Sequence, residues 1–270
     1  MDRKDVAYMI NTTPKYFYLL EFHLTMLWRY APSLQWPVFI VTEEPDHEEI
    51  VKLKKTFTLP LHLHIIPLTQ DKEAFFESRA EGTRGLPPEI QYVFPIQEDF
   101  ILEGRPMEKV LEGLFGILEE SPSVSSMRLM PCPGPAGVCK FGETDWVLLD
   151  SAVDEYVFTY QATVWRREAY QYFMDSLILG VEKEYGIYLE PKQKADIQIK
   201  MNVGECRFGQ EILAKVTRGS MHLAWPRVDP QPNAVYLCPW PYRPTAVVQG
   251  KLEGWAIELA AREGIVLLGR

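Results

Sequence analysis

The chain has 270 residues, of which 47% are hydrophobic, 12% aromatic and 24% charged. This composition is typical of a folded globular protein with a large core, and it excludes disordered, collagen-like and small disulfide-stabilised proteins. The 28 Lys and Arg residues against 37 Asp and Glu give a formal net charge of −9, and the basic residues form no stripe. Nucleic acid is therefore not an expected partner, because binding to a phosphate backbone needs concentrated positive charge.

The N-terminal residues predict a cytoplasmic protein. Met1–Asp5 lead into a polar and aromatic stretch that lacks the apolar core of an export signal. No run of the sequence approaches the roughly 18 consecutive apolar residues of a membrane span, so no transmembrane segment is expected. Cys132, Cys139, Cys206 and Cys238 contain no Cys-x-x-Cys pair, which disfavours a zinc site and disulfide bonds.

Strand and helix signals alternate over the first hundred residues. Short apolar runs predict strands over residues 6–10, 38–41, 61–68 and 92–100. Amphipathic spacing predicts a helix that starts at Pro14 with Thr13 as its N-cap, a helix with Asp46 as its N-cap that ends near Lys55, and a short helix over residues 72–79. The order βαβαβαβ implies a parallel sheet with helices on both faces.

The second part of the chain mixes further helices and strands. The expected helices cover residues 106–120, 166–179, 191–201, 210–217 and 251–262, and the expected strands 125–130, 146–149 and 156–164. Six prolines between residues 226 and 244 predict an extended segment, and its aromatic residues indicate an ordered wrap or lid. No glycine-rich dinucleotide or P-loop sequence follows the first strand, which removes the main support for a dehydrogenase or a P-loop NTPase.

Polar residues follow the first two strands directly. Asn11 and Thr12 end the first strand, and Thr42 and Glu43 end the second. Ligands of open parallel sheets bind beyond the carboxyl ends of the strands. By position, these four residues are expected to line a pocket for a base and a ribose.

Two adjacent carboxylates end the fourth strand. The apolar run 92–96 leads into Gln97-Glu98-Asp99. Because neighbouring residues of a strand point to opposite faces, Gln97 and Asp99 are expected on one face and Glu98 on the other. Carboxylate oxygens suit Mg²⁺ or Mn²⁺, which are commonly held by one or two carboxylates together with substrate phosphates. The pattern therefore favours a nucleoside diphosphate as ligand.

With this motif the sequence resembles glycosyltransferases of the GT-A fold, whose nucleotide-binding half begins βαβαβαβ. In that family an Asp-x-Asp or shortened x-Glu-Asp motif ends the fourth strand and holds the metal on the donor diphosphate. Gln97-Glu98-Asp99 stands in that place without the first acid. The resemblance implies Mn²⁺ or Mg²⁺ at Asp99, with Gln97 or Glu98 near ribose or sugar hydroxyls.

The resemblance also implies a fold and a division of the chain. The expected fold is α/β, a GT-A-like, Rossmann-related, mostly parallel central sheet flanked by helices. Residues 1–103 would form the donor-binding half, and residues 104–270 the acceptor-binding half with the proline- and aromatic-rich segment, both within one domain.

Further residues receive roles from the resemblance. GT-A enzymes commonly place a basic residue from the loop before the fourth strand on the diphosphate, which implies Arg79 and, second, Arg84, since a guanidinium donates two hydrogen bonds to phosphate. Several GT-A families supply a metal ligand from a C-terminal His, here His222. A buried, hydrogen-bonded His is the alternative. The expected acceptor-binding residues are Gln161, Trp165, Trp225 and Trp240. For Trp165 the alternative is a position in the apolar core.

The predicted function is transfer of a sugar, with a UDP-sugar favoured, from a nucleoside diphosphate donor to a glycan or other hydroxyl acceptor. Asp145, Asp154 and Glu211 are candidates for the general base of an inverting enzyme, and the sequence does not choose among them. A non-catalytic carbohydrate-binding module on the same scaffold is the alternative. A sugar-nucleotide nucleotidylyltransferase is less favoured, because Asn11-Thr12-Thr13-Pro14 is not its glycine-rich loop.

Overall fold

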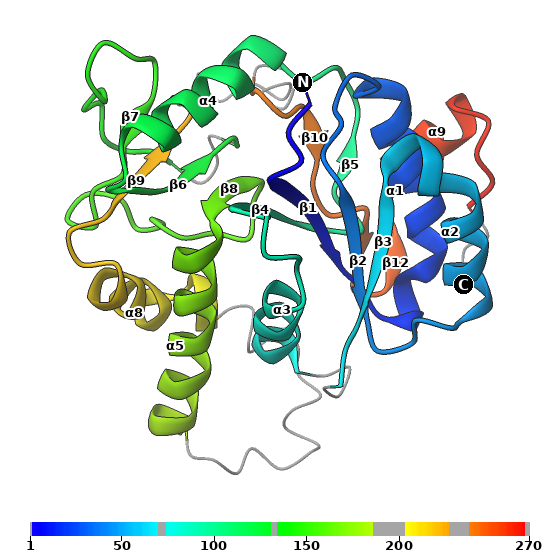
Figure 1. Ribbon diagram of the computed structural model, residues 1–270, viewed down its shortest axis with the longest axis horizontal. Helices are drawn as coiled ribbons and strands as arrows, with labels where there is room; N and C mark the ends of the chain where they lie inside the picture. The colour runs from blue at the N-terminus through cyan, green and yellow to red at the C-terminus, as the bar shows by residue number, and fades with distance from the viewer. Residues whose placement is uncertain (1, 70–73, 131–133, 186–202, 227–237, 268–270) are drawn as a thin grey trace.

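An eight-stranded sheet with the order β3-β2-β1-β4-β8-β6-β9-β7 forms the centre of the protein (Figure 1). The computed structural model describes residues 2–69, 74–130, 134–185, 203–226 and 238–267. The strands are β1 (Val6–Asn11), β2 (Val38–Thr42), β3 (Leu63–Pro67), β4 (Tyr92–Gln97), β6 (Val124–Arg128), β7 (Val147–Leu148), β8 (Thr163–Arg166) and β9 (Met221–Ala224). Only β8 and β7 run antiparallel to their neighbours in this sheet. The predicted mostly parallel α/β architecture is confirmed.

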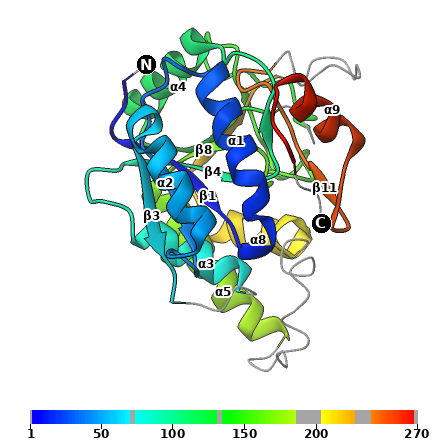
Figure 2. The ribbon, with the colours of Figure 1, turned by 90° about the vertical axis from the view of Figure 1, so that its right-hand side faces the viewer.

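Helices cover both faces of the sheet (Figures 1 and 2). The α-helices of the described residues include α1 (Phe17–Tyr30), α2 (Glu48–Leu61), α3 (Phe75–Arg84), α4 (Glu108–Glu120), α5 (Arg167–Tyr185), α8 (Arg207–Val216) and α9 (Gly254–Arg262). One apolar core lies between the sheet and α1, α2 and α4, and a second lies between the sheet and α3, α5 and α8. In β1, Tyr8 and Ile10 enter the first core and Ala7 and Met9 the second, which is why this strand is apolar throughout.

The first two helix starts differ from the sequence expectation. Pro14–Tyr16 form a 3-10 turn before α1, and Thr13 makes no side-chain capping hydrogen bond. At α2 the capping acceptor is the His47 ring, which accepts a hydrogen bond from the backbone N–H of Glu49. Asp46 lies one residue too early to fill that position.

Some segments of the second half also differ. The expected strand over residues 156–164 is reduced to β8, and β9 is a strand that the pattern did not predict. The expected helix over residues 191–201, and part of the segment between residues 226 and 244, lie outside the described residues. No helix in the described ranges is long and apolar enough to cross a bilayer.

The fourth strand is shorter than expected, and this changes the geometry of its acids. β4 ends at Gln97, and Glu98 and Asp99 form a turn in which the Phe100 N–H donates to the Gln97 carbonyl at 3.1 Å. The chain then enters β5 (Ile101–Leu102), which belongs to a separate two-stranded sheet. The predicted placement of the two acids on opposite faces is wrong, because a turn does not continue the alternation of a strand.

The C-terminal part of the chain returns to the end of β4. β10 (Tyr242–Arg243) pairs with β5, and β11 (Val247–Val248) pairs with β12 (Lys251–Leu252) in a hairpin. Helix α9 packs on α1 through a small apolar cluster that also contains Ile101. The division of the chain at residue 103 stays a prediction, and the central sheet contains strands from both sides of it.

Candidate functional site

A cavity of about 640 Å³ opens at the carboxyl ends of β1, β2 and β4. Ligands of open α/β sheets bind at this edge, and the volume is that of a small-molecule site. The predicted site residues that line the cavity are Asn11, Thr12, Glu43, Arg79, Gln97, Glu98, Asp99 and Gln161. The fold therefore brings most of the predicted donor-binding residues to one space, whereas their individual roles stay predictions.

Three polar side-chain atoms in the cavity wall make no hydrogen bond to the described part of the chain. They are Thr12 Oγ1, Gln97 Nε2 and Tyr160 Oη. Thr12 is 4% exposed and Tyr160 8%. An unpaired buried polar group costs about 1–3 kcal/mol, so such groups are rare in folded proteins. These three buried groups therefore carry a desolvation cost in the wall of the cavity.

The charges of the adjacent carboxylates Glu98 and Asp99 are only partly compensated by the described residues. Burial, followed by the charge of Asp99, raises the pKa of Glu98 to about 8, although the charge of Arg79 lowers it in part. Burial raises the pKa of Asp99 to about 6, although the backbone N–H of Val247 donates a hydrogen bond that lowers it. Neither carboxylate forms an ion pair with the described residues. A bound cation would stabilise both anionic forms.

This pair of acids fits a divalent cation such as Mg²⁺ or Mn²⁺. Both ions take hard oxygen ligands, and the protein commonly supplies only one or two of them. Among the described residues, no three His, Cys, Asp or Glu side chains gather as a complete set of metal ligands. Substrate phosphates and water would therefore have to fill the remaining positions.

A buried hydrogen-bond network holds the turn that carries the two acids. The His23 ring lies 3.2 Å from the Glu98 carbonyl through Nδ1 and 2.7 Å from the Tyr8 hydroxyl through Nε2. Burial lowers the pKa of His23 to about 4, so the ring is neutral at neutral pH. A neutral ring that donates from Nδ1 to the carbonyl accepts at Nε2 from the Tyr8 hydroxyl. Through this network β1 and α1 fix the position of the β4 end.

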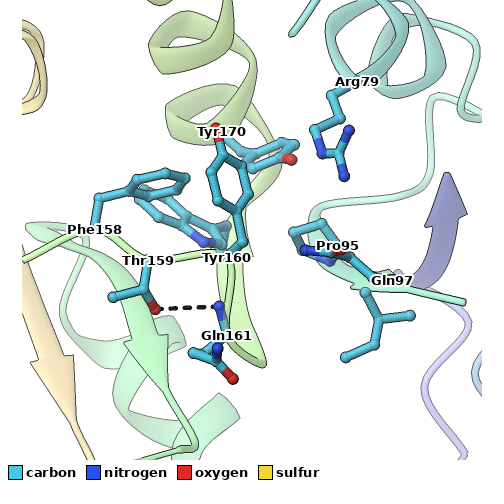
Figure 3. Close-up of a pocket in the computed structure, with 10 residues that line it drawn as sticks. Arg79, Pro95, Gln97, Phe158, Thr159, Tyr160, Gln161 and Tyr170 are labelled. Atoms are coloured by element: carbon cyan, nitrogen blue, oxygen red, sulfur yellow. Dashed lines mark hydrogen bonds between the residues drawn. The ribbon is translucent and has the colours of Figure 1, made fainter. Parts of the chain in front are cut away.

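Arg79 brings a buried cation to the same cavity. Its side chain is 5% exposed, and its guanidinium lies 3.5 Å from the centroid of the Phe75 ring and 5.6 Å from that of the Tyr160 ring. Figure 3 shows Arg79 with Gln97 and Tyr160 around a second pocket, which shares these three residues with the large cavity. Nη1 donates a hydrogen bond to the Phe75 carbonyl at 3.1 Å. Within the described ranges no carboxylate forms an ion pair with Arg79, so its charge is available to an anionic ligand.

Two predicted donor-binding residues do not reach the cavity. Thr42 is fully buried, and its hydroxyl accepts a hydrogen bond from the Glu44 N–H that stabilises the end of β2. Arg84 is exposed and forms an ion pair with Asp175 on α5. Arg84 follows Arg79 by five residues on α3, which rotates it about 140° around the helix axis, away from the cavity. These two placements are corrections to the sequence prediction.

The three tryptophans predicted to bind the acceptor are packed elsewhere. Trp165 on β8 is 2% exposed and lies in the core. Trp240 is fully buried and stacks on Trp36, with ring centroids 6.0 Å apart. Trp225 packs edge-on against Trp146 at 5.2 Å. None of the three lines the large cavity, because their apolar rings fill contacts between the sheet and its flanking segments.

The three acids predicted as a general base also lie outside the cavity. Asp154 is buried, and its carboxylate accepts a hydrogen bond from the Ala136 N–H at 2.6 Å, which fixes a loop. Glu211 pairs with Arg207 on the exposed side of α8 at 3.0 Å. The side chain of Asp145 is 75% exposed. None of these acids is in place to act on a ligand in the cavity.

His222 lies in the core on β9, and the structure does not bring it to Asp99. Its Nδ1 is 2.8 Å from the Ser126 hydroxyl and its Nε2 is 3.0 Å from the Thr217 hydroxyl. Both ring nitrogens are therefore occupied by neighbours, and the ring is 5% exposed. The predicted role as metal ligand is corrected to that of a hydrogen-bonded core residue.

The burial of two histidines predicts a loss of stability in acid. Burial lowers the pKa of both His23 and His222 from 6.5 to about 4. Between these values the unfolded chain binds more protons than the folded one, so the free energy of unfolding falls as pH falls. From neutral pH to about pH 5, each His contributes a loss of about 2 kcal/mol. We expect urea unfolding of His222→Gln to show a pH-dependent loss that is smaller by about this amount. An unchanged pH dependence would mean that the His222 ring takes up a proton in the folded protein.

The cavity also contains residues that the sequence pattern did not single out. Lys15 and Tyr16 follow the polar end of β1, so their position after the first strand was a usable signal. Glu205, Thr245 and residues 247–250 of the C-terminal hairpin reach the cavity from distant parts of the chain. No local pattern marks such residues, because only the fold brings them to the end of β4.

No protein-family model and no curated protein matches the chain. Solved structures of S. aureus TarS are similar to it. The TarS 1–349 fragment is 11% identical with a TM-score of 0.44, over 74% of this chain and 55% of that chain. The same fragment with UDP is 13% identical with a TM-score of 0.47, and the match covers 85% of this chain and 58% of the fragment. The fragment with UDP-GlcNAc is 13% identical with a TM-score of 0.42, and the match covers 74% of this chain and 53% of the fragment. The matched part of this chain thus spans little more than half of the TarS fragment.

Proposed function

We propose that the protein is a glycosyltransferase that uses a nucleoside diphosphate sugar and a hydroxyl acceptor. The observation that carries this proposal is the meeting of Glu98, Asp99 and the buried Arg79 guanidinium in one cavity at the carboxyl ends of the parallel strands. A diphosphate offers anionic oxygens to Arg79 and to a cation on the acids.

Different cavity residues would contact different parts of such a donor. Asn11, Thr12 and Glu43, at the ends of β1 and β2, would contact the base and ribose. Arg79 would bind the diphosphate, because a guanidinium can donate two parallel hydrogen bonds to phosphate oxygens. Gln161, whose amide oxygen accepts from the Tyr242 hydroxyl, would lie on the acceptor side.

Asp99, with Glu98 beside it, would hold Mg²⁺ or Mn²⁺. When bound, the cation neutralises charge on the departing diphosphate, which lowers the barrier to its release. The residues of the chain prepare this site in two ways. The network through His23 fixes the turn, and Arg79 places a second positive charge on the same leaving group. UDP and UDP-GlcNAc, which the TarS structures contain, are the first nucleotides to test.

We expect one of UDP, GDP, CDP and dTDP to raise the melting temperature in the presence of Mn²⁺ and not in the presence of EDTA. A ligand at about 100 times its dissociation constant stabilises a protein by roughly 2.7 kcal/mol. For a chain of this size that is several degrees. Asp99→Asn removes one anionic oxygen from the proposed metal site, so this variant should lose most of the metal-dependent shift.

Asp145→Asn is the matched control, because Asp145 is an exposed acid that does not line the cavity. This variant should respond to the nucleotide as the wild type does. The proposal is wrong if no nucleotide stabilises the wild type at millimolar concentration. Stabilisation by sugars alone, without nucleotide or metal, would instead support a carbohydrate-binding module.

A further inference from the structure

A third acid lines the cavity, and the donor site described above does not use it. Glu205 comes from the segment that precedes α8, far in sequence from the acids at the end of β4. Its Oε1 accepts a hydrogen bond of 2.6 Å from the backbone N–H of Tyr160. Within the described part of the chain Oε2 makes no hydrogen bond and no ion pair. One oxygen of the carboxylate is thus anchored, and the other remains able to accept a proton.

Close backbone packing fixes the segment that carries Glu205. A Cβ atom on Gly204 would lie 2.2 Å from the Tyr160 hydroxyl oxygen, and one on Gly209 would lie 2.1 Å from the Gly204 carbonyl oxygen. Only glycine allows these approaches without movement of the neighbours. The backbone around Glu205 therefore lies directly against the first turn of α8 on one side and against Tyr160 on the other.

The side chain of Gln210 joins the same two segments. Its Oε1 accepts from the Phe158 N–H at 2.8 Å, and its Nε2 donates to the Phe158 carbonyl at 2.9 Å and to the Glu205 carbonyl at 3.2 Å. With the Glu205 bond to Tyr160, three hydrogen bonds connect residues 158–160 to residues 205–210. Such a connection limits the movement of the carboxylate, as a group that must meet a reacting atom requires.

The surroundings of Glu205 also strengthen it as a base. Burial raises its pKa, and the Tyr160 N–H and the charge of Arg128 oppose this only in part. A carboxylate with a raised pKa binds a proton more strongly than a solvated one. The acids that the sequence suggested do not compete for this role, since Asp145, Asp154 and Glu211 lie outside the cavity.

We propose that Glu205 is the general base that deprotonates the acceptor hydroxyl, an assignment that rests on the proposed glycosyltransferase function. The hydroxyl proton passes to Glu205 Oε2 while the hydroxyl oxygen forms a bond to the anomeric carbon. The bond from that carbon to the diphosphate oxygen breaks, and its electron pair leaves with the nucleoside diphosphate. The proton is later released to water. Attack and departure occur on opposite faces, so the sugar is transferred with inversion of its anomeric configuration.

The test uses Glu205→Gln in the full chain, with UDP-GlcNAc and Mn²⁺ as donor and with water or N-acetylglucosamine as acceptor. Gln keeps an oxygen that accepts the Tyr160 N–H, but it does not take up the proton. General-base catalysis contributes about 10²–10⁴-fold, so UDP release should fall by that factor. The UDP dissociation constant from calorimetry should stay within about twofold and the melting temperature near that of the wild type, because the site is otherwise intact. The limb of the pH–rate profile that reports an ionised base should disappear.

Glu211→Gln is the matched control, because this acid lies six residues further along the chain and forms an exposed ion pair with Arg207. It should release UDP at the wild-type rate. The assignment is overturned if Glu205→Gln releases UDP as fast as the control does, or if its UDP affinity falls in proportion to its rate. It is also overturned if the product retains the anomeric configuration of the donor. The same holds if the wild type binds UDP but releases none from UDP-GlcNAc. Absence of binding of UDP, GDP, CDP and dTDP by the wild type would instead overturn the donor site, and the base assignment with it. Unchanged binding with an unchanged rate would overturn the base assignment alone.

Discussion

Replacement of Trp240 by alanine is expected to lower the free energy of unfolding by about 3–5 kcal/mol, the usual result of truncating a buried aromatic residue. Trp240 is fully buried, stacks on Trp36 with an interplanar angle of 10°, and meets the Phe94 ring edge-on at 5.1 Å. Removal of the indole would leave a cavity beside Tyr8, Trp36 and Phe94. The melting temperature should fall by roughly 10 °C, which calorimetry or a thermal melt measures.

Trp28→Ala is the control for this change. Trp28 is 49% exposed at the end of α1, so its truncation should cost about 1 kcal/mol or less. A Trp240→Ala variant as stable as Trp28→Ala would contradict the buried position of Trp240. It would return the residue to the sugar-stacking role that the sequence first suggested.

Replacement of Gly209 by alanine is expected to destabilise the protein by about 3 kcal/mol, the upper part of the range for overpacking. The added Cβ would lie 2.1 Å from the Gly204 carbonyl oxygen and 2.6 Å from that of Val203. Both are backbone atoms, so no side-chain rotation relieves the clash. The turn before α8 must move, and Glu205 would move with it. Chemical unfolding of the variant measures the loss.

Gly113→Ala is the matched control, because Gly113 lies inside α4 with no atom within 4 Å of the added Cβ. Alanine lowers the conformational entropy of the unfolded chain and favours the helix, so this variant should be more stable than the wild type by about 0.5–1 kcal/mol. Equal effects of the two substitutions would contradict the tight packing at Gly209.

The arrangement of strands could be predicted because its signals are local. The apolar runs that became β1, β2, β3 and β4 are each long enough to identify a buried strand, and the segments between them have helical spacing. Parallel strands that alternate with helices can form only a few topologies, so the meeting of Asn11, Thr12, Glu43 and Asp99 at one edge followed from their positions. The exact end of β4 could not be predicted from local sequence. The strand ends there because the following residues, β5, pair with β10 in a separate sheet, and that pairing is a long-range contact.

The roles of single side chains were less predictable, since they depend on contacts between distant residues. The resemblance implied His222 as a metal ligand, with a buried, hydrogen-bonded His as the alternative. The alternative holds, because β9 pairs with β6 and places Ser126 beside the ring. The resemblance implied Arg79 first and Arg84 second for the diphosphate, and the period of α3 brings only Arg79 to the cavity. Glu205 had no distinguishing neighbours in the sequence, and Gly204, Gly209 and Tyr160 explain its position only when they are seen together.

The sequence by itself determined a mostly parallel sheet covered by helices, and it placed an acid pair at the carboxyl end of a central strand. These properties follow from hydrophobic periodicity and from the order of the elements, and both can be recognised from residues that are close together in the sequence. The tertiary structure decided which charged and aromatic side chains face the cavity and which lie in the core. Whether a side chain faces the cavity or the core depends on long-range packing, because its neighbours in space come from distant parts of the chain.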